Sequence, residues 1–155
     1  LGIGPDTPVV AYDRQGGAYA ARLWWMLRWM GHDAVAVLDG GSKAWLAAGG
    51  ALVADGAAPA PRPPYPERPA RATRLDTATL AARLGRVALI DARAAARFRG
   101  ETEPFDAIAG HIPGALNRFH GDNLQPDGRF RPAAELRAAF APLLGLASPA
   151  DAVHS

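Results

Sequence analysis

The chain has 155 residues, of which 49% are hydrophobic, so it can fill the core of one ordinary domain or of parts of two. Its 17 basic and 15 acidic residues leave a net charge of +2, and the arginines are scattered along the chain, without the basic stripe that a nucleic-acid surface needs. No apolar run reaches the roughly 20 residues that cross a bilayer, and the absence of cysteine excludes disulfides and thiolate metal sites within these residues. We expect a soluble, cytoplasmic protein that binds neither nucleic acid nor a membrane.

The first third of the chain predicts alternating strands and helices, which is typical of an α/β fold. The predicted elements, in chain order, are a strand at 9–12, a helix at 18–30 that Gly31 ends, a strand at 34–38 and a short helix at 43–48. Ser42 is the expected N-cap of the short helix. The longer helix is apolar on almost every side, so we expect Trp24, Trp25, Leu27 and Trp29 to lie in a core.

A proline-rich segment follows at residues 57–72, with six prolines between positions 59 and 69. This composition favours extended polyproline II and opposes a helix or a central strand. We interpret the segment as a linker between two α/β halves. The alternative is a ligand for an SH3-type groove.

The remaining residues return to the α/β pattern. The predicted elements are a helix capped by Asp76 that ends at 84, a strand at 87–90, a helix at 94–98, a short strand at 115–116, a helix from 132 to 140 and a strand at 152–155.

Asp13 ends the first predicted strand and is followed by a short loop that contains Gly16 and Gly17. A loop between a strand and a helix N-terminus is suited to hold an anion, because unpaired backbone N–H groups and the helix dipole converge there. We therefore expect this loop to enclose a negative charge.

Several motifs in this order resemble the tandem-domain rhodaneses, that is, thiosulfate and 3-mercaptopyruvate sulfurtransferases. "VVAYD…GG…YAARLWWMLRWMGH" and "VAVLDGGSKAWLAAGG" resemble the second half of their catalytically silent first domain, and "LIDARAAARFRGETEP", "AGHIPGALN" and "DNLQPDGRF" resemble the first half of their active second domain. The resemblance implies a rhodanese-like fold, with a mostly parallel sheet flanked by helices. It also implies three parts: half of the silent domain at 1–56, the linker at 57–72 and half of the catalytic domain at 73–155.

The resemblance implies transfer of a sulfane sulfur from thiosulfate or 3-mercaptopyruvate, through a cysteine persulfide, to cyanide or a thiol acceptor. No cofactor and no metal are expected. In that family the nucleophilic cysteine follows a strand that resembles "AVHS", so we expect it just after Ser155 and expect the chain alone to be inactive. Overlaying "VVAY" on "AVHS" puts Asp13 at the corresponding position of the silent domain, as an internal anion in place of the nucleophile.

Arg97, the first arginine of "RFRGE", takes the family position whose guanidinium binds the sulfonate or carboxylate of the donor. Arg99 is expected to point elsewhere. Some mercaptopyruvate-type relatives carry a second arginine in the stretch that reads "ETEPFDAIAG" here, which has none, so the preferred donor stays open.

Other polar residues near this position are expected to be structural. His111 is expected to tie the "GHIPG" turn to its surroundings, the alternatives being a metal ligand or a general base. Asp91 is expected to fix the following turn or to pair with Arg93, the alternative being a catalytic acid. Glu101, Glu103 and Asp106 are expected to form a solvated acidic loop.

Two half-domains would expose sheet edges and apolar helix faces. We hypothesise that they pack as one permuted domain with a single sheet, within one chain, by strand exchange in a dimer, or together with a missing C-terminal piece. The alternative function is a non-catalytic rhodanese-like binding or regulatory module, which the cysteine-free loop at Asp13 favours. A cysteine-dependent phosphatase is a weaker third possibility.

Overall fold

The computed structural model describes residues 2–54, 56 and 60–155, and the chain forms two compact units. Unit 1 extends to Arg74 and includes Pro126–Arg129, and unit 2 comprises Leu75–Gln125 and Phe130–Ser155. The first residues of the predicted linker, 57–59, lie outside the described residues. Assignment of the units to a silent and a catalytic domain stays a proposal.

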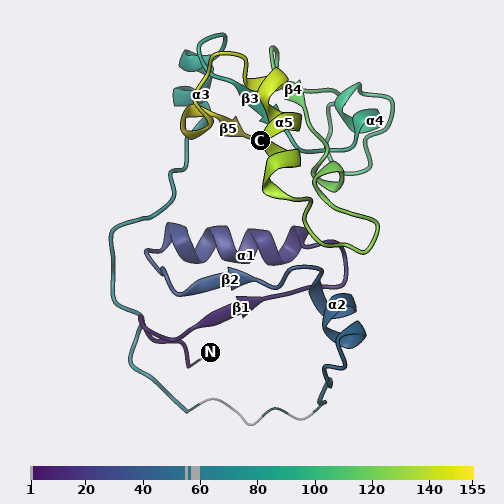
Figure 1. Ribbon diagram of the computed structural model, residues 1–155. Coiled ribbons are helices and arrows are strands. Elements are labelled where there is room, and N and C mark those ends of the chain that lie inside the picture. The colour runs from purple at the N-terminus through teal and green to yellow at the C-terminus, as the bar shows by residue number, and fades with distance from the viewer. Residues whose placement is uncertain (1, 55, 57–59) are drawn as a thin grey trace. The chain divides into compact units, whose positions relative to one another are not determined.

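Unit 1 is built on a strand, helix and strand in succession. β1 (Val9–Ala11) and β2 (Val35–Val37) pair in parallel, and α1 (Ala18–Trp29) connects them and packs against both (Figure 1). α1 ends as predicted, since Gly31 follows it with a φ of 80°, a left-handed conformation that a glycine adopts without strain. A short helix, α2 (Gly41–Ala47), follows β2.

The predicted N-cap of α2 is wrong. The helix begins one residue after Gly40, and Ser42 lies buried inside its first turn, where its hydroxyl donates to the carbonyl oxygen of Asp13 at 3.3 Å. The reason is a close approach of backbones, because a Cβ at Gly41 would lie 2.5 Å from that carbonyl oxygen.

The predicted burial of the tryptophans of α1 is also wrong in part. Trp24 is 36% exposed and Trp29 is 41% exposed, and among the residues of α1 only Ala20 is fully buried. A two-stranded sheet covers only one side of a helix, and guanidinium groups lie over the exposed rings instead, Arg28 over Trp24 and Arg74 over Trp29, each at 5.6 Å.

The described part of the proline-rich segment belongs to unit 1 and contacts the rest of that unit at every third residue. The Tyr65 hydroxyl lies 2.8 Å from Nδ1 of His32, Arg68 donates to the Pro5 carbonyl at 3.5 Å, and Arg71 pairs with Asp33 at 3.3 Å. Extended polyproline chains have three residues per turn, so every third side chain faces the same way.

His32 anchors this segment and has no exposed surface. Its Nε2 lies 3.0 Å from the carbonyl oxygen of Thr7, which can only accept, so Nε2 carries the proton. In the neutral ring Nδ1 then accepts from the Tyr65 hydroxyl. Residues far apart in the sequence are thus joined by one buried imidazole.

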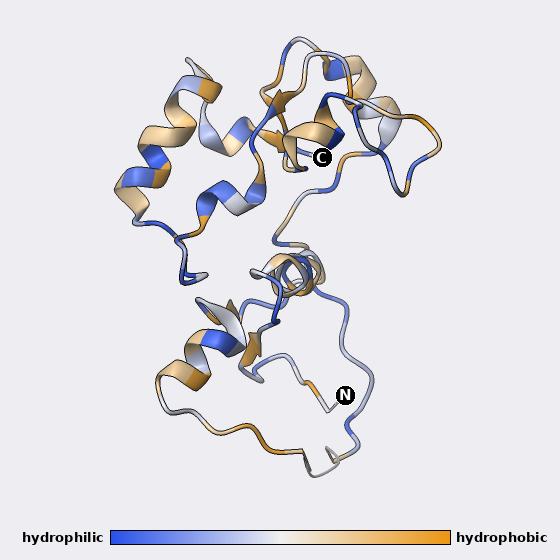
Figure 2. Cartoon of the chain, turned by 90° about the vertical axis from the view of Figure 1, so that its right-hand side faces the viewer, coloured by the Kyte–Doolittle hydropathy of each residue, from blue (hydrophilic) through white to orange (hydrophobic). Residues whose placement is uncertain are grey.

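Unit 2 contains a three-stranded parallel sheet in the order β4-β3-β5. Its strands are β3 (Leu89–Asp91), β4 (Leu116–Asn117) and β5 (Val153–His154), and its helices are α3 (Thr77–Arg83), α4 (Ala95–Phe98), α5 (Ala133–Leu144) and 3-10 turns at His120–Asn123 and Pro149–Asp151. β3 is buried along its whole length, and Figure 2 shows hydrophobic colouring on the strands. The central strand is therefore the core of this unit.

In unit 2 the predicted start of α3 is confirmed and the predicted end of α5 is wrong. Asp76 caps α3, since its carboxylate accepts from the backbone N–H of Thr79 at 2.7 Å. α5 continues four residues beyond its predicted end at 140 and contains Pro142 in its last turn. A proline there removes only one backbone hydrogen bond near the helix end, where such bonds are few.

The described strands form one sheet within each unit, and the hypothesis that the two halves pack as one permuted domain stays a prediction. Parallel pairing forms where a crossover connection returns the chain, and the pairs β1–β2 and β3–β4 each lie within one unit. Strand exchange between two chains stays a prediction.

Among the described residues, no helix has the length and apolar character to cross a membrane.

Replacement of Tyr65 by Phe tests the anchoring role of His32. We expect Tyr65→Phe to lower the free energy of unfolding by about 1 to 2 kcal/mol, because Nδ1 of a buried imidazole loses its donor. All four tryptophans lie in unit 1, so their fluorescence in a urea titration follows this unit. Tyr19, an exposed tyrosine of the same unit, provides the matched control Tyr19→Phe, and equal effects of the two substitutions would refute the anchoring role.

Candidate functional site

The loop between β1 and α1 encloses the carboxylate of Asp13. Oδ1 accepts from the backbone N–H groups of Gln15 and Gly17 at 2.8 Å, and Oδ2 accepts from those of Tyr19 and Ala20 at 3.0 Å. Gly16 and Gly17 have φ values of 78° and 85°, which allow the loop to turn back around the carboxylate.

The ionised carboxylate of Asp13 occupies the anion site of this loop. Partial burial raises the pKa of the carboxyl, but the four backbone N–H groups outweigh it and hold the pKa below its ordinary value. The hollow beside the loop measures about 70 Å³ and is lined by Arg14 and Lys43 together with Asp13 and neighbouring glycines. A second anion in the loop would have to displace an ionised side chain that is already fully hydrogen-bonded.

A second cluster of charges begins where β3 ends. Asp91 is buried, and its carboxylate accepts from Nε and Nη2 of Arg93, the shortest contact being 2.7 Å, and from the backbone N–H of Arg93 at 2.9 Å. Burial raises the pKa of Asp91, and the hydrogen bonds from Arg93 overcome it and lower the pKa. Asp91 thus both fixes the turn after the strand and pairs with Arg93, the two roles that the sequence left as alternatives.

Arg97, on α4, lies in the same cluster and pairs with two carboxylates. Its Nε and Nη2 donate to both oxygens of Glu103, at distances from 2.8 to 3.2 Å, and Nη2 also donates to Asp106 at 3.2 Å. The guanidinium carbon lies 5.2 Å from the centre of the Phe105 ring. Glu103 therefore fixes the orientation of the Arg97 guanidinium.

The expectation of a solvated acidic loop is wrong for Glu103, whose side chain is only 5% exposed. Hydrogen bonds from Arg97, and further ones from the backbone N–H groups of Phe105 and Asp106, lower the pKa of Glu103 to about 2. The sequence offers no local signal for this burial, because the arginine partners lie six and ten residues earlier in the chain.

The remaining predicted residues of this region have structural contacts. Arg99 points away from the cluster and pairs with Glu101 on the surface. Nδ1 of His111 donates to the carbonyl oxygen of Phe98 at 2.7 Å, and the two rings stack with centroids 3.7 Å apart. His111 thereby ties the turn after it to the end of α4.

The cluster lies at the edge of the sheet where the parallel strands end. Ser155 follows β5 and its backbone N–H donates to the carbonyl of Ile90, one residue before Asp91. Asn117, at the end of β4, donates to the carbonyls of Asp91 and Arg93. Since ligands of parallel α/β sheets bind outside the carboxyl ends of the strands, this edge is the candidate site.

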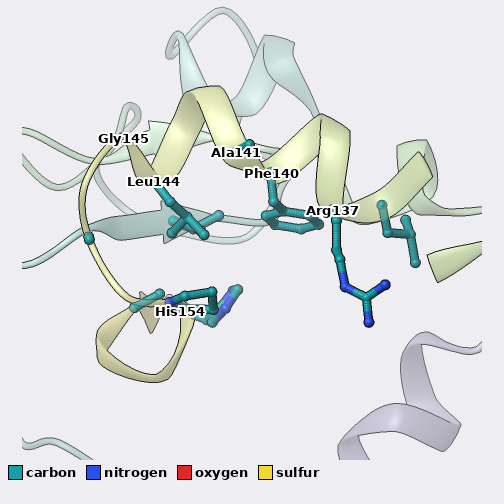
Figure 3. A pocket seen from close by; sticks show the side chains of 11 residues that line it. Arg137, Phe140, Ala141, Leu144, Gly145 and His154 are labelled. Carbon is teal, nitrogen blue, oxygen red and sulfur yellow. The ribbon is translucent and has the colours of Figure 1, made fainter. Parts of the chain in front are cut away.

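An apolar cavity of about 450 Å³ lies elsewhere in unit 2, beneath α5 (Figure 3). Phe140 and Leu144 of the helix point into it, opposite His154 of β5, and burial lowers the pKa of His154. None of the site residues predicted from the sequence lines this cavity. Within the part of the chain that the structure describes, no group of three potential ligands could hold a metal ion.

Comparison with known proteins identifies the family. The model of the rhodanese-like domain matches residues 1–48. The chain is 49% identical over 146 residues to a probable 3-mercaptopyruvate sulfurtransferase of Pseudomonas aeruginosa, covering 92% of this chain and 51% of the relative. The chain belongs to the rhodanese family.

Other relatives agree with this membership. A putative thiosulfate sulfurtransferase of Mycobacterium tuberculosis is 43% identical over 131 residues, which is 83% of this chain and 46% of the relative. The crystal structure of the 3-mercaptopyruvate sulfotransferase SseA from Escherichia coli superposes with a TM-score of 0.70 at 32% identity, over 94% of this chain and 55% of that one. The chain has a rhodanese-like fold, and it spans about half the length of the curated relatives that it matches.

Replacement of Asp13 tests whether the rhodanese loop after β1 depends on its internal anion. We expect Asp13→Ala to destabilise unit 1 by about 2 kcal/mol, because four backbone N–H groups lose their acceptor. Tryptophan fluorescence in urea measures this change. Asp6→Ala removes an exposed aspartate of the same unit as a control, and an Asp13→Ala variant no less stable than this control would contradict the role of the carboxylate.

Replacement of Glu103 tests the buried charge of unit 2 through its pH dependence. The folded pKa of Glu103, about 2, lies below its ordinary value of 4.5, so its stabilising contribution is present above about pH 4.5 and is lost as the pH falls toward 2. We therefore expect Glu103→Gln to destabilise unit 2 at neutral pH and to flatten the loss of stability in acid. Hydrogen exchange of the β3 amides between about pH 7 and pH 3 measures both effects.

Glu101→Gln is the matched control, since Glu101 pairs with Arg99 in an exposed position. An acid limb that is equally steep in Glu103→Gln and in the wild type would show that the charge of Glu103 does not stabilise the fold.

Proposed function

We propose that these residues form part of a sulfurtransferase of the rhodanese family, which moves a sulfane sulfur from thiosulfate or 3-mercaptopyruvate to cyanide or a thiol acceptor. The observation that carries this proposal is the 49% identity, over nearly the whole chain, to a probable 3-mercaptopyruvate sulfurtransferase. The residues from 73 onward, in this proposal, belong to the catalytic domain, and residues 1–56 belong to a silent domain joined to it by the proline-rich linker.

The reaction requires a cysteine thiolate. In the first step the thiolate attacks the outer sulfur of thiosulfate or the thiol sulfur of 3-mercaptopyruvate. The S–S bond of thiosulfate then breaks and sulfite leaves, or the C–S bond of 3-mercaptopyruvate breaks and the enolate of pyruvate leaves and takes the proton of the donor's thiol. In the second step the acceptor takes the outer sulfur of the persulfide and the thiolate is regenerated. The 155 residues contain no cysteine, so in this proposal the nucleophile is supplied from outside them.

The geometry of the loop after β1 supports a position for that thiolate in the corresponding loop after β5. Four backbone N–H groups converge there on a carboxylate, and a loop of the same design after β5 would lower the pKa of a thiol in the same way. The loop at Asp13 is then the silent counterpart of a catalytic loop that follows Ser155.

Arg97 is the proposed binding residue for the anionic group of the donor. Its guanidinium is planar and permanently charged, which suits a sulfonate or a carboxylate. It follows β3 at the carboxyl edge of the sheet, and the backbone of Ser155 pairs with the same strand. Its Nη1 has no hydrogen-bond partner among the described residues, so one donor group is available to a ligand.

A non-catalytic rhodanese-like module is the second candidate function, and the filled loop at Asp13 favours it. The two candidates differ in the residue that follows Ser155 in the reading frame of the gene, a cysteine in the enzyme and another residue in the module. A cytoplasmic location, a strand-exchanged dimer and association with a further C-terminal segment stay predictions.

A chimera tests the enzymatic proposal. The 155 residues replace the aligned segment of the Pseudomonas aeruginosa relative, which covers about half of that protein. We expect the chimera to produce thiocyanate from cyanide with thiosulfate or with 3-mercaptopyruvate, and we expect Arg97→Gln to lower kcat/KM for the donor at least about tenfold. The ratio of the two donors' kcat/KM values identifies the preferred one.

Arg99→Gln is the matched control, because Arg99 pairs with Glu101 away from the cluster. A folded chimera that is inactive with both donors would refute the proposal. The 155-residue chain alone is expected to produce no thiocyanate, since it has no thiol to receive sulfur.

A further inference from the structure

Arg97 is held by two carboxylates of very different character. Glu103 is nearly buried and binds through both oxygens to Arg97, to Arg93 and to two backbone N–H groups. Asp106 accepts one hydrogen bond from Arg97, at 3.2 Å, and its side chain is 62% exposed.

The cluster carries no excess positive charge. Its two arginines, Arg93 and Arg97, face three carboxylates, those of Asp91, Glu103 and Asp106. An anion that approaches Arg97 therefore meets a guanidinium whose charge is already compensated. An anion that binds through both Nη1 and Nη2 requires that one of the carboxylates withdraw from Nη2, because Nη1 alone has no partner among the described residues.

Only Asp106 can withdraw at small cost. Withdrawal of Glu103 would break its hydrogen bonds with two arginines and with two backbone N–H groups, at a position where its side chain is only 5% exposed. Asp106 would exchange one hydrogen bond with an arginine for water, to which it is already exposed. The two carboxylates thus have different roles. Glu103 orients the guanidinium, and Asp106 is a hydrogen-bond partner of Nη2 that a ligand can displace.

We propose that Asp106 is an internal competitor for the donor, bound to Nη2 of Arg97 in the free protein and displaced by the oxyanion group of the donor. This inference rests on the proposed role of Arg97 in donor binding. The displaced group is a sulfonate-type oxyanion in thiosulfate and a carboxylate in 3-mercaptopyruvate. Asp106 then sets donor affinity without contacting the sulfur that is transferred.

Calorimetric titration of the full chain with thiosulfate, and separately with 3-mercaptopyruvate, tests this proposal. We expect Asp106→Asn to lower Kd about two- to fivefold, the range of an exposed charge pair. Glu101→Gln, which removes an exposed carboxylate from Arg99, should leave Kd unchanged, and Arg97→Gln should abolish the gain. A gain with only one of the two donors identifies the oxyanion that displaces Asp106.

A spectroscopic readout separates displacement from a general effect on stability. The side-chain Nε–H resonance of Arg97 should shift on Asp106→Asn in the same direction as on addition of thiosulfate to the wild type. A resonance that responds to thiosulfate but not to the substitution would overturn the proposal.

The remaining outcomes separate a failure of the competitor role of Asp106 from a failure of donor binding by Arg97. If Arg97→Gln abolishes binding and Asp106→Asn binds no tighter than the wild type, the competitor role of Asp106 is wrong and donor binding by Arg97 stands. If Arg97→Gln binds each donor as the wild type does, Arg97 is not the donor site. If neither the wild type nor Asp106→Asn binds either donor, the competitor proposal is overturned.

Discussion

A negative charge near the end of a parallel strand must be neutralised by groups that the fold brings to it. Asp13 meets this condition with four backbone N–H groups of one loop and helix turn. Asp91 meets it with the guanidinium of Arg93. The two solutions differ in range, because the first uses residues within seven positions of the carboxylate and the second starts a network that extends to residue 110.

The difference in range has a functional consequence. The loop around Asp13 is closed to other anions, since its donors are taken by a side chain that belongs to the loop itself. The cluster after β3 contains arginines that are oriented by one buried carboxylate and contacted by an exposed one. In the proposed function, the filled loop fits a silent domain, and an arginine with a displaceable carboxylate partner fits donor binding.

The proline-rich segment illustrates how composition and structure complement each other. Its six prolines predict an extended chain, and the described residues contact unit 1 at every third position. Composition alone does not identify the partner of Tyr65, because His32 lies 33 residues earlier and becomes a suitable partner only when it is buried.

The sequence by itself determined the order of the elements, the cap at Asp76, the end of α1 at Gly31 and the motifs that identify the rhodanese family, because such signals act within a few residues. Only the tertiary structure decided which side chains are buried. Trp24 and Trp29 are exposed because a two-stranded sheet covers one side of their helix. The side chain of Glu103 is only 5% exposed because it pairs with both Arg93 and Arg97. Burial depends on the partners that the fold assembles, and local sequence patterns do not contain that information.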